Sequence, residues 1–283
     1  MDGQTDGQYH HAHYNRQKTI IASLKSIMEQ TYTDWELLII DDGSKDQTEA
    51  VVQRFITEQA IAQKVSYHKL LQNSGANHAR NVGVKLATGK YLAFQDSDDK
   101  WLPDKLAKQV AILEEEPTAA ICLCQMATYE NDKLIAKTPV DEFSAADVTL
   151  SNLLQINFAS TQTIVGTSSC FKNNLFDESL PRLQDWDLML RLIQKYPIVY
   201  CPEVLIEQFI SADSITKNVS QGIRAFSLIL DKYSELYAKN KFAKYNVKVV
   251  RAEFKLQQGR SLLKLAEFYY NRLLRKFYKL TSQ

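Results

Sequence analysis

The chain has 283 residues, of which 45% are hydrophobic, and its formal net charge is +1. This length and apolar content are enough for a large buried core, so the composition excludes a disordered chain. A net charge so close to zero provides no field that would attract a polyanion, and we expect no nucleic-acid partner. The four cysteines lack zinc-site spacing, and there is no signal peptide or apolar run of about 18 residues. We therefore expect a cytoplasmic protein.

The beginning of the chain does not look like a buried strand. Residues 1–13 contain two glycines and three histidines among polar side chains, without the Val and Ile run of a parallel strand. We interpret this segment as an irregular leader. One hypothesis is that the start is truncated or altered, which would remove a first strand, and the other is that the polar segment forms a poor substitute strand.

Helix and strand patterns alternate through the next part of the chain. Short apolar runs predict strands, and spacing of three or four residues predicts helices between them. The expected strands are residues 36–40, 65–70, 90–95 and 119–127, and the expected helices are residues 48–63, 77–87 and 104–115. This alternation predicts an α/β protein in which ligands bind outside the carboxyl ends of the strands.

An acidic cluster follows the expected strand at residues 90–95. Asp96, Asp98 and Asp99 lie within four positions, where their negative charges repel one another. Such a cluster is either a solvated turn or is neutralised by a divalent cation, and carboxylate oxygens suit magnesium or manganese. The cluster alone leaves both readings open.

Two other acidic motifs have an ordinary structural explanation as well. Asp41 and Asp42 follow the strand at residues 36–40 and can cap the next helix, with Gly43 permitting the bend. Asp185 can cap a helix, and Asp187 can sit in its first turn, where the helix dipole favours a negative charge.

Five motifs together resemble the family 2 glycosyltransferases, which are inverting nucleotide-sugar enzymes of the GT-A fold. In chain order they are Tyr14-Asn15-Arg16, Asp41-Asp42-Gly43-Ser44, Ser74-Gly75-Ala76-Asn77-His78-Ala79-Arg80-Asn81, Asp96-Ser97-Asp98-Asp99 and Gln184-Asp185-Trp186-Asp187. The resemblance covers roughly residues 14–216. It implies a Rossmann-like mixed sheet flanked by helices, with a nucleotide half at about residues 14–127 and an acceptor half at about residues 128–216.

The resemblance also implies which residues bind the nucleotide. Asp42, with Asp41 beside it, would face the base, and Tyr14 would lie against the ring with Arg16 nearby. Arg80 would lie near the diphosphate, although by pattern alone it could equally be a surface residue of a helix.

For the chemistry, the resemblance implies a metal site and a base. Asp96, Asp98 and Asp99 would hold Mn²⁺ or Mg²⁺, which stabilises the departing nucleoside diphosphate as a Lewis acid. Asp185 corresponds to the family's catalytic aspartate, which would deprotonate the acceptor hydroxyl as general base. Gln184 stands where the family usually has a glutamate.

We expect the acceptor to bind near Gln184, Trp186 and Thr161, from the positions of these residues in the sequence. Trp186 either packs beneath the site or lines an acceptor groove. Ser211 lies near where some relatives carry a histidine that helps to bind metal or diphosphate, so this ligand is missing here.

The end of the chain, residues 217–283, reads as a helical and basic extension. Residues 241–283 contain eleven Lys and Arg against two acidic residues. Residues 262–280 alternate apolar and basic side chains as an amphipathic helix does. This helix either packs back on the catalytic domain or lies on an anionic membrane surface, which would place the protein at the inner face of the plasma membrane.

The expected function is therefore an inverting hexosyl- or N-acetylhexosaminyl-transferase. It would move a sugar from a nucleotide diphosphate sugar, uridine-linked, to a saccharide or lipid-linked saccharide acceptor in cell-surface polysaccharide synthesis. One alternative is a catalytically inactive relative that binds nucleotide or glycan. The other is a nucleotidyltransferase, for which we find no glycine-rich phosphate loop.

Overall fold

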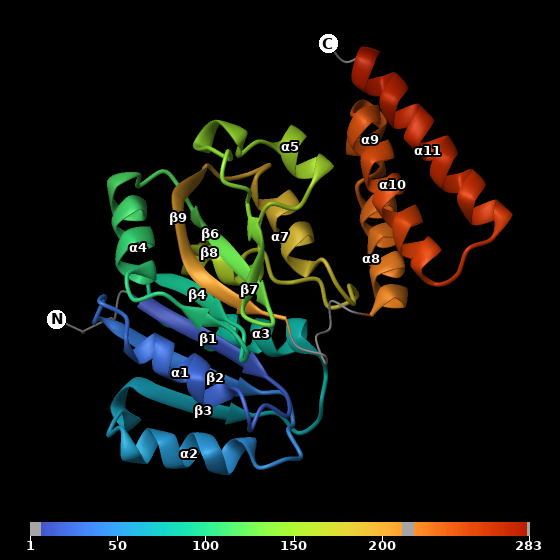
Figure 1. Ribbon diagram of the computed structural model, residues 1–283. Helices are drawn as coiled ribbons and strands as arrows, with labels where there is room; N and C mark the ends of the chain where they lie inside the picture. The colour runs from blue at the N-terminus through green and yellow to red at the C-terminus, as the bar shows by residue number, and fades with distance from the viewer. Residues whose placement is uncertain (1–6, 211–217, 282–283) are drawn as a thin grey trace.

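The structure, a computed structural model, describes residues 7–210 and 218–281. In these residues nine strands form one sheet, in the order β3-β2-β1-β4-β8-β6-β9-β5 with β7 paired to β6 (Figure 1). The strands are β1 Gly7–His13, β2 Trp35–Asp41, β3 Val65–Lys69, β4 Tyr91–Gln95, β5 Lys100–Trp101, β6 Ile121–Glu130, β7 Lys133–Thr138, β8 Ile164–Thr167 and β9 Ile198–Phe209. The predicted α/β class with a mixed sheet is confirmed.

Helices flank this sheet on both faces and follow it at the end of the chain. They are α1 Ile20–Met28, α2 Thr48–Glu58, α3 Ala76–Leu86, α4 Lys105–Glu115, α5 Leu150–Gln155, α6 Ser168–Lys172, α7 Gln184–Leu192, α8 Val219–Lys232, α9 Ser234–Lys239, α10 Lys241–Gln257 and α11 Leu262–Thr281, with short 3₁₀ turns η1 Ala62–Lys64, η2 Ala145–Asp147 and η3 Thr161–Thr163. None of the helices within the described residues is both long and apolar enough to cross a membrane.

The strand β1 lies at the centre of the parallel half of the sheet. It pairs in parallel with β2 from Gly7 to His13 and with β4 from Gly7 to His11. Two neighbours satisfy its backbone hydrogen-bonding groups, which compensates for side chains that are poor strand formers. The expectation of an irregular leader is therefore wrong for these seven residues, which form the polar strand of our second hypothesis. Residues 1–6 lie outside the described part.

The sheet is buried on both faces. In β4, Leu92 and Phe94 belong to one hydrophobic cluster, whereas Tyr91 and Ala93 belong to the cluster on the other face. Successive side chains of a strand point to opposite faces, so a strand covered on both sides needs a continuous apolar run. The apolar run at residues 90–95 has this pattern.

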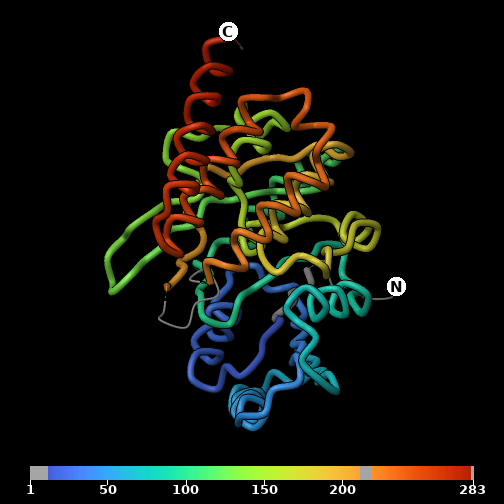
Figure 2. Tube along the Cα trace, turned by 90° about the vertical axis from the view of Figure 1, so that its right-hand side faces the viewer, coloured from blue at the N-terminus to red at the C-terminus, as the bar shows by residue number. Residues whose placement is uncertain are grey.

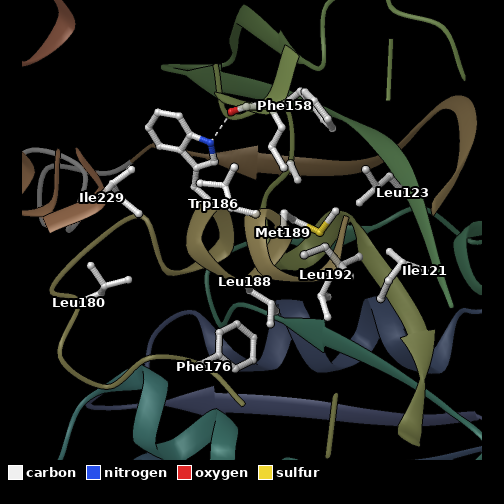
Figure 3. Packing of buried hydrophobic residues seen from close by; sticks show 14 of the residues in the cluster. Ile121, Leu123, Phe158, Phe176, Leu180, Trp186, Leu188, Met189, Leu192 and Ile229 are labelled. Carbon is white, nitrogen blue, oxygen red and sulfur yellow. Dashed lines mark hydrogen bonds between the residues drawn. The ribbon is translucent and has the colours of Figure 1, made fainter. Parts of the chain in front are cut away.

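One face of the sheet is covered by α7, whose apolar side chains enter the first cluster. Figure 3 shows Trp186, Met189 and Leu192 of α7 in the same cluster as Leu123 of β6. Because α7 begins with Gln184 and Asp185, the same packing holds that motif in a fixed position.

The C-terminal helices form a packed group, in which the helical run expected from the sequence is interrupted. The chain at residues 244–280 reads as continuously helical in sequence, but α10 ends at Gln257 and α11 begins at Leu262. Gly259 lies between them with φ of +119°, a conformation that ends a helix and reverses the chain. The two helices then pack as a hairpin, in which Tyr245 stacks on Tyr278 at 5.5 Å.

Candidate functional site

The carboxyl ends of β2, β1 and β4 carry the predicted nucleotide-binding residues. Asp42 is buried, and its two carboxylate oxygens accept the backbone N–H groups of Ser74 and Gly75, each at 2.8 Å. The loop that precedes α3 is therefore held directly against the end of β2. This contact brings two of the five motifs together.

The turn at residues 41–44, which follows β2, is equally constrained. Asp41 is fully buried and accepts the Ser44 N–H at 2.8 Å and the Tyr67 hydroxyl at 2.6 Å. Burial, followed by the hydrogen bond to Asp41, raises the pKa of Tyr67. Gly43 has φ of +76°, and a Cβ atom there would lie 2.8 Å from the backbone carbon of Gln72. Only glycine permits this approach of the two loops.

Tyr14 and Arg16 lie in the turn that follows β1. The Tyr14 side chain is 37% exposed, so its ring is open to solvent and to a ligand. The turn is held by its backbone, because Asn15 N–H donates to Ser44 Oγ and Arg16 N–H donates to Thr48 Oγ1, each at 2.9 Å. The Tyr-Asn-Arg motif is thus fixed beside the end of β2.

Arg80 of α3 is buried and reaches the acidic loop. Its Nη2 donates to Asp96 Oδ1 at 2.9 Å, its guanidinium lies 5.7 Å from the centre of the Phe176 ring, and its Nη1 has no hydrogen-bond partner among the described residues. The alternative of an ordinary surface residue is excluded by this burial. An unpaired buried N–H is costly, so this donor is available for an anionic ligand.

The three carboxylates of the acidic loop have different environments. Burial and the charge of Asp96 raise the pKa of Asp98, while Arg16 lowers it. Asp99 is almost fully buried, and it accepts the Phe209 N–H at 2.9 Å and a short hydrogen bond from Gln162 Nε2. Its pKa is raised by burial and then by Asp96 and Asp98. Asp99 is therefore occupied by protein contacts, unlike Asp98.

The donor set of this loop fits a hard divalent cation. Asp98 accepts no hydrogen bond from another described residue. Within the described residues, Asp96 forms an ion pair with Arg80 alone. The pKa of Asp98 is raised by burial and by the charge of Asp96, so Asp98 lacks enough nearby positive charge to balance it. No group of three or more His, Cys, Asp or Glu side chains in residues 7–210 and 218–281 is arranged as a metal site. The ligands of such an ion would therefore include non-protein oxygens.

Asp185 lies at the start of α7, close to the Arg80–Asp96 pair. Its Oδ1 accepts the Trp186 N–H at 2.7 Å and the Asn157 amide at 3.2 Å. Burial raises its pKa, the charge of Asp96 adds to this effect, and Arg80 opposes it. The preceding Leu183 has φ of +62°, a left-handed conformation that costs about 1–2 kcal/mol and gives the chain a sharp entry into α7. The third acidic motif is thus part of the same site.

The residues expected on the acceptor side are not equally accessible. Gln184 is partly exposed beside Asp185. Trp186 is 3% exposed and its indole N–H donates to the Leu153 carbonyl at 2.6 Å, so it packs beneath the site (Figure 3). Thr161 is 2% exposed, because the 3₁₀ turn η3 in which it lies packs against the sheet. Direct contact with an acceptor is therefore open to Gln184 alone among these three. Ser211 lies outside the described residues.

The sequence analysis missed two residues that organise this site. Asn157 contacts the Asp185 carboxylate, but nothing in its surroundings in the sequence marks it. Asp187, which we read as a first-turn residue, is fully buried and binds Lys232 Nζ at 2.6 Å, the Tyr233 hydroxyl at 2.8 Å and Arg191 Nε at 3.0 Å. It joins α7 to α8, and so connects the Gln184–Asp187 motif to the C-terminal helices.

Comparison with known proteins gives relatives that are named as glycosyltransferases. The chain is 32% identical over 213 residues to TuaG of Bacillus subtilis, named as a teichuronic acid biosynthesis glycosyltransferase, which covers 72% of this chain and 79% of that protein. It is 42% identical over 103 residues to WfgD of Escherichia coli, a UDP-Glc:alpha-D-GlcNAc-diphosphoundecaprenol beta-1,3-glucosyltransferase, which covers 35% of this chain and 38% of that one. An uncharacterized glycosyltransferase of Rickettsia felis is 32% identical over 65% of this chain, which spans only 30% of that relative.

Solved structures show the same fold at low sequence identity. S. aureus TarS 1-349 in complex with UDP-GlcNAc superimposes with a TM-score of 0.65 at 18% identity, covering 97% of this chain and 92% of that one. The mannosyltransferase PcManGT from Pyrobaculum calidifontis, in complex with GDP-Man and Mn²⁺, gives a TM-score of 0.63 at 17% identity, covering 98% and 83%. The predicted GT-A fold is confirmed.

The profile of the family described as Glycosyl transferase family 2 matches residues 12–179, which contain four of the five motifs. This match covers more than half of the chain. The protein therefore belongs to glycosyl transferase family 2.

Proposed function

We propose that this chain is an inverting glycosyltransferase that uses a nucleotide diphosphate sugar, with uridine as the nucleoside. The observation that carries the proposal is the convergence of Arg80, Asp96 and Asp185 from three separate elements. A cation, a metal-binding carboxylate and a carboxylate of raised proton affinity meet at one end of the sheet. This set supplies what sugar transfer needs, namely charge neutralisation for a leaving diphosphate and a base for the acceptor.

The donor nucleotide would lie over the ends of β1 and β2. The exposed Tyr14 ring can stack on a base, and Asp42 holds the Ser74–Gly75 loop that would border it. Arg80, with its free buried Nη1, would then face the diphosphate. The UDP-GlcNAc complex of the similarly folded TarS supports a uridine-linked donor.

Asp96 and Asp98 would hold the divalent metal, Mn²⁺ or Mg²⁺, together with oxygens of the donor. Such a cation supplies Lewis-acid neutralisation of the departing nucleoside diphosphate when it is bound. We assign Asp99 a positioning role instead, because Gln162 and Phe209 already occupy its oxygens. The Mn²⁺ complex of PcManGT supports a metal-dependent site.

Asp185 would accept the proton of the attacking acceptor hydroxyl. The acceptor oxygen forms its bond to the anomeric carbon as the bond to the diphosphate breaks, and no covalent enzyme intermediate is needed. The raised pKa brings this carboxylate closer to neutral pH, which makes it a stronger base than a solvated aspartate. Asn157 and the Trp186 N–H hold its orientation.

The acceptor would be a saccharide or a lipid-linked saccharide of cell-surface polysaccharide synthesis. A pocket of about 200 Å³ lies beside Asn157 and is lined on its apolar side by Pro139, Phe143 and Phe158. Its position next to the contact between Asn157 and Asp185 makes it our candidate acceptor site. The names of TuaG and WfgD support this acceptor class.

The proposal is tested by binding and hydrolysis of a panel of nucleotide sugars, with and without Mn²⁺. We expect a uridine-linked donor to bind, and Asp98→Asn to lose the Mn²⁺-dependent part of the affinity. The matched control is Asp231→Asn, which removes an exposed carboxylate of α8. Failure of every nucleotide sugar to bind would contradict the proposal, and binding without any turnover would favour an inactive relative.

A further inference from the structure

The outer face of α11 is an unusual surface. Of the fourteen large hydrophobic side chains that are exposed within the described residues, seven belong to this one helix, and each of the seven is more than half exposed. They are Leu262 at 86%, Leu263 at 84%, Tyr269 at 59%, Tyr270 at 63%, Leu273 at 71%, Phe277 at 55% and Leu280 at 68%. A contiguous exposed patch of this kind marks an interaction surface.

These side chains share one side of the helix. Leu262, Tyr269, Leu273, Phe277 and Leu280 are spaced by seven, four, four and three residues, which places them in a single stripe along the helix. The helix is 20 residues long, or about 30 Å at 1.5 Å per residue. We refer to these five residues as the outer stripe.

The opposite side of α11 is already used for packing. Tyr278 stacks on Tyr245 of α10, and Arg275 Nη1 donates to Asn246 Oδ1 at 3.2 Å. Asn271 is buried between the helices. We expected this helix either to pack back on the catalytic domain or to lie on an anionic membrane surface. The structure shows it packed against α10, with the outer stripe exposed. Figures 1 and 2 show α11 on the outside of the molecule, with its C-terminal end extending beyond the neighbouring helices.

The exposed charged residues of α11 beside the outer stripe are positive. Arg272, Lys276 and Lys279 are exposed and spaced by four and three residues, so they form a parallel row next to the stripe. The single acidic residue of α11, Glu267, points to α10, where it binds Arg251 and Lys255. Burial and the neighbouring cations Lys244 and Arg251 lower the pKa of Lys248 in α10. This hairpin therefore carries a concentrated positive charge.

We infer that the outer stripe and its basic row dock on an anionic lipid bilayer, with α11 lying in the plane of the interface. An apolar face bordered by cations has the chemistry of helices that bind anionic membrane surfaces. Tyr269 and Phe277 add aromatic rings, which favour the boundary between headgroups and acyl chains. This inference rests on α11 alone and does not depend on the proposed function.

A second copy of the chain would be a poorer partner for the same face. Two copies of α11 packed stripe to stripe would bring their rows of Arg272, Lys276 and Lys279 close together, and the one carboxylate of α11, Glu267, is already bound to α10. Like charges facing each other in this way destabilise a contact. Charge complementarity therefore selects the bilayer.

Cosedimentation of the full chain with vesicles tests the inference. The wild-type chain should bind phosphatidylcholine vesicles that contain phosphatidylglycerol much more tightly than vesicles of phosphatidylcholine alone. The double variant Leu273→Glu/Phe277→Glu should bind at least about tenfold more weakly, because both apolar anchors become charged. The matched control Leu134→Glu/Ile135→Glu alters two exposed apolar residues of β7 and should bind as the wild type does. An unchanged circular dichroism spectrum shows that each variant is folded.

The basic row is tested separately. Neutralising Arg272, Lys276 and Lys279 with Gln should weaken binding to the anionic vesicles by about fivefold for each charge, or about 100-fold together. A control that neutralises three exposed lysines elsewhere has the same net charge and should retain binding. These control positions are Lys25, Lys85 and Lys133.

Two results would overturn the assignment. The first is a wild-type chain that ignores anionic vesicles, or that binds them equally well with and without the Leu273→Glu/Phe277→Glu change. The second is a dimer in sedimentation equilibrium that this double variant dissociates, because the outer stripe would then be the contact between two copies.

Discussion

Lys105 allows the free-energy cost of a buried positive charge in this protein to be measured. It is fully buried at the first position of α4, and its Nζ has no hydrogen-bond partner among the described residues. The ammonium lies 4.3 Å from the centre of the Trp101 ring, a favourable cation–π contact. Burial lowers the pKa of Lys105 from 10.5 to about 8. The positive end of the α4 dipole also disfavours a cation at this position.

The pKa difference converts into a stability difference of definite sign. Because the unfolded chain holds this proton up to about pH 10.5 and the folded chain only to about 8, stability should rise with pH between these values. Below pH 8 the full cost applies, about 3 kcal/mol. Lys105→Met keeps an unbranched side chain and removes the charge, but it loses a cation–π contact of about 1 kcal/mol. We therefore expect a net gain of about 2 kcal/mol at pH 7, or about 3–4 °C in Tm for a chain of this length.

Calorimetric Tm values of wild type and variant at pH 7 and at pH 10 test this reasoning. The gain should be present at pH 7 and should shrink at pH 10, where Lys105 of the wild type is neutral. Lys108→Met is the control, because Lys108 lies on the same helix but is exposed and bound to Glu203. A lower Tm for Lys105→Met at pH 7, or a gain independent of pH, would refute the argument.

Three further predictions concern the site. Gly43→Ala should lower stability by about 2 kcal/mol or more, and weaken nucleotide binding in calorimetric titration, because its Cβ would meet the backbone of Gln72 at a positive φ; normal values for both would count against this turn geometry. Asp187→Asn should cost about 2–3 kcal/mol in denaturant unfolding, since the buried side chain loses its ion pairs with Lys232 and Arg191, and an unchanged midpoint would exclude that role. The acid limb of the rate profile should lie at a higher pH than that of an ordinary aspartate, because burial raises the pKa of Asp185, which must be unprotonated to act; a limb near pH 4 or below would contradict this.

Much of the fold could be predicted because its apolar runs and acidic motifs are strong local signals. The strand β4 is apolar on both faces, and the Asp96 cluster marks its end. The strand β1 could not be predicted in the same way, since its place between β2 and β4 is set by backbone pairing rather than by its polar side chains. The glycine that separates α10 from α11 was visible in the sequence, but its effect depends on a local conformation.

The site was predictable in outline and not in detail. Arg80, Asp96 and Asp185 come from recognisable motifs, and the structure brings them together. Whether a carboxylate such as Asp99 faces a ligand or the protein depends on side chains far away in sequence, here Gln162. Long-range contacts of this kind leave no local pattern in the chain.

The most direct test of the central claim is the rate of UDP release from the preferred uridine-linked donor in Asp185→Asn. We predict a rate about 10²- to 10⁴-fold below that of the wild type, with UDP binding within about twofold, because the change removes the base and leaves the nucleotide contacts intact. Wild-type turnover by Asp185→Asn would contradict the account, since the acceptor proton would then need another base.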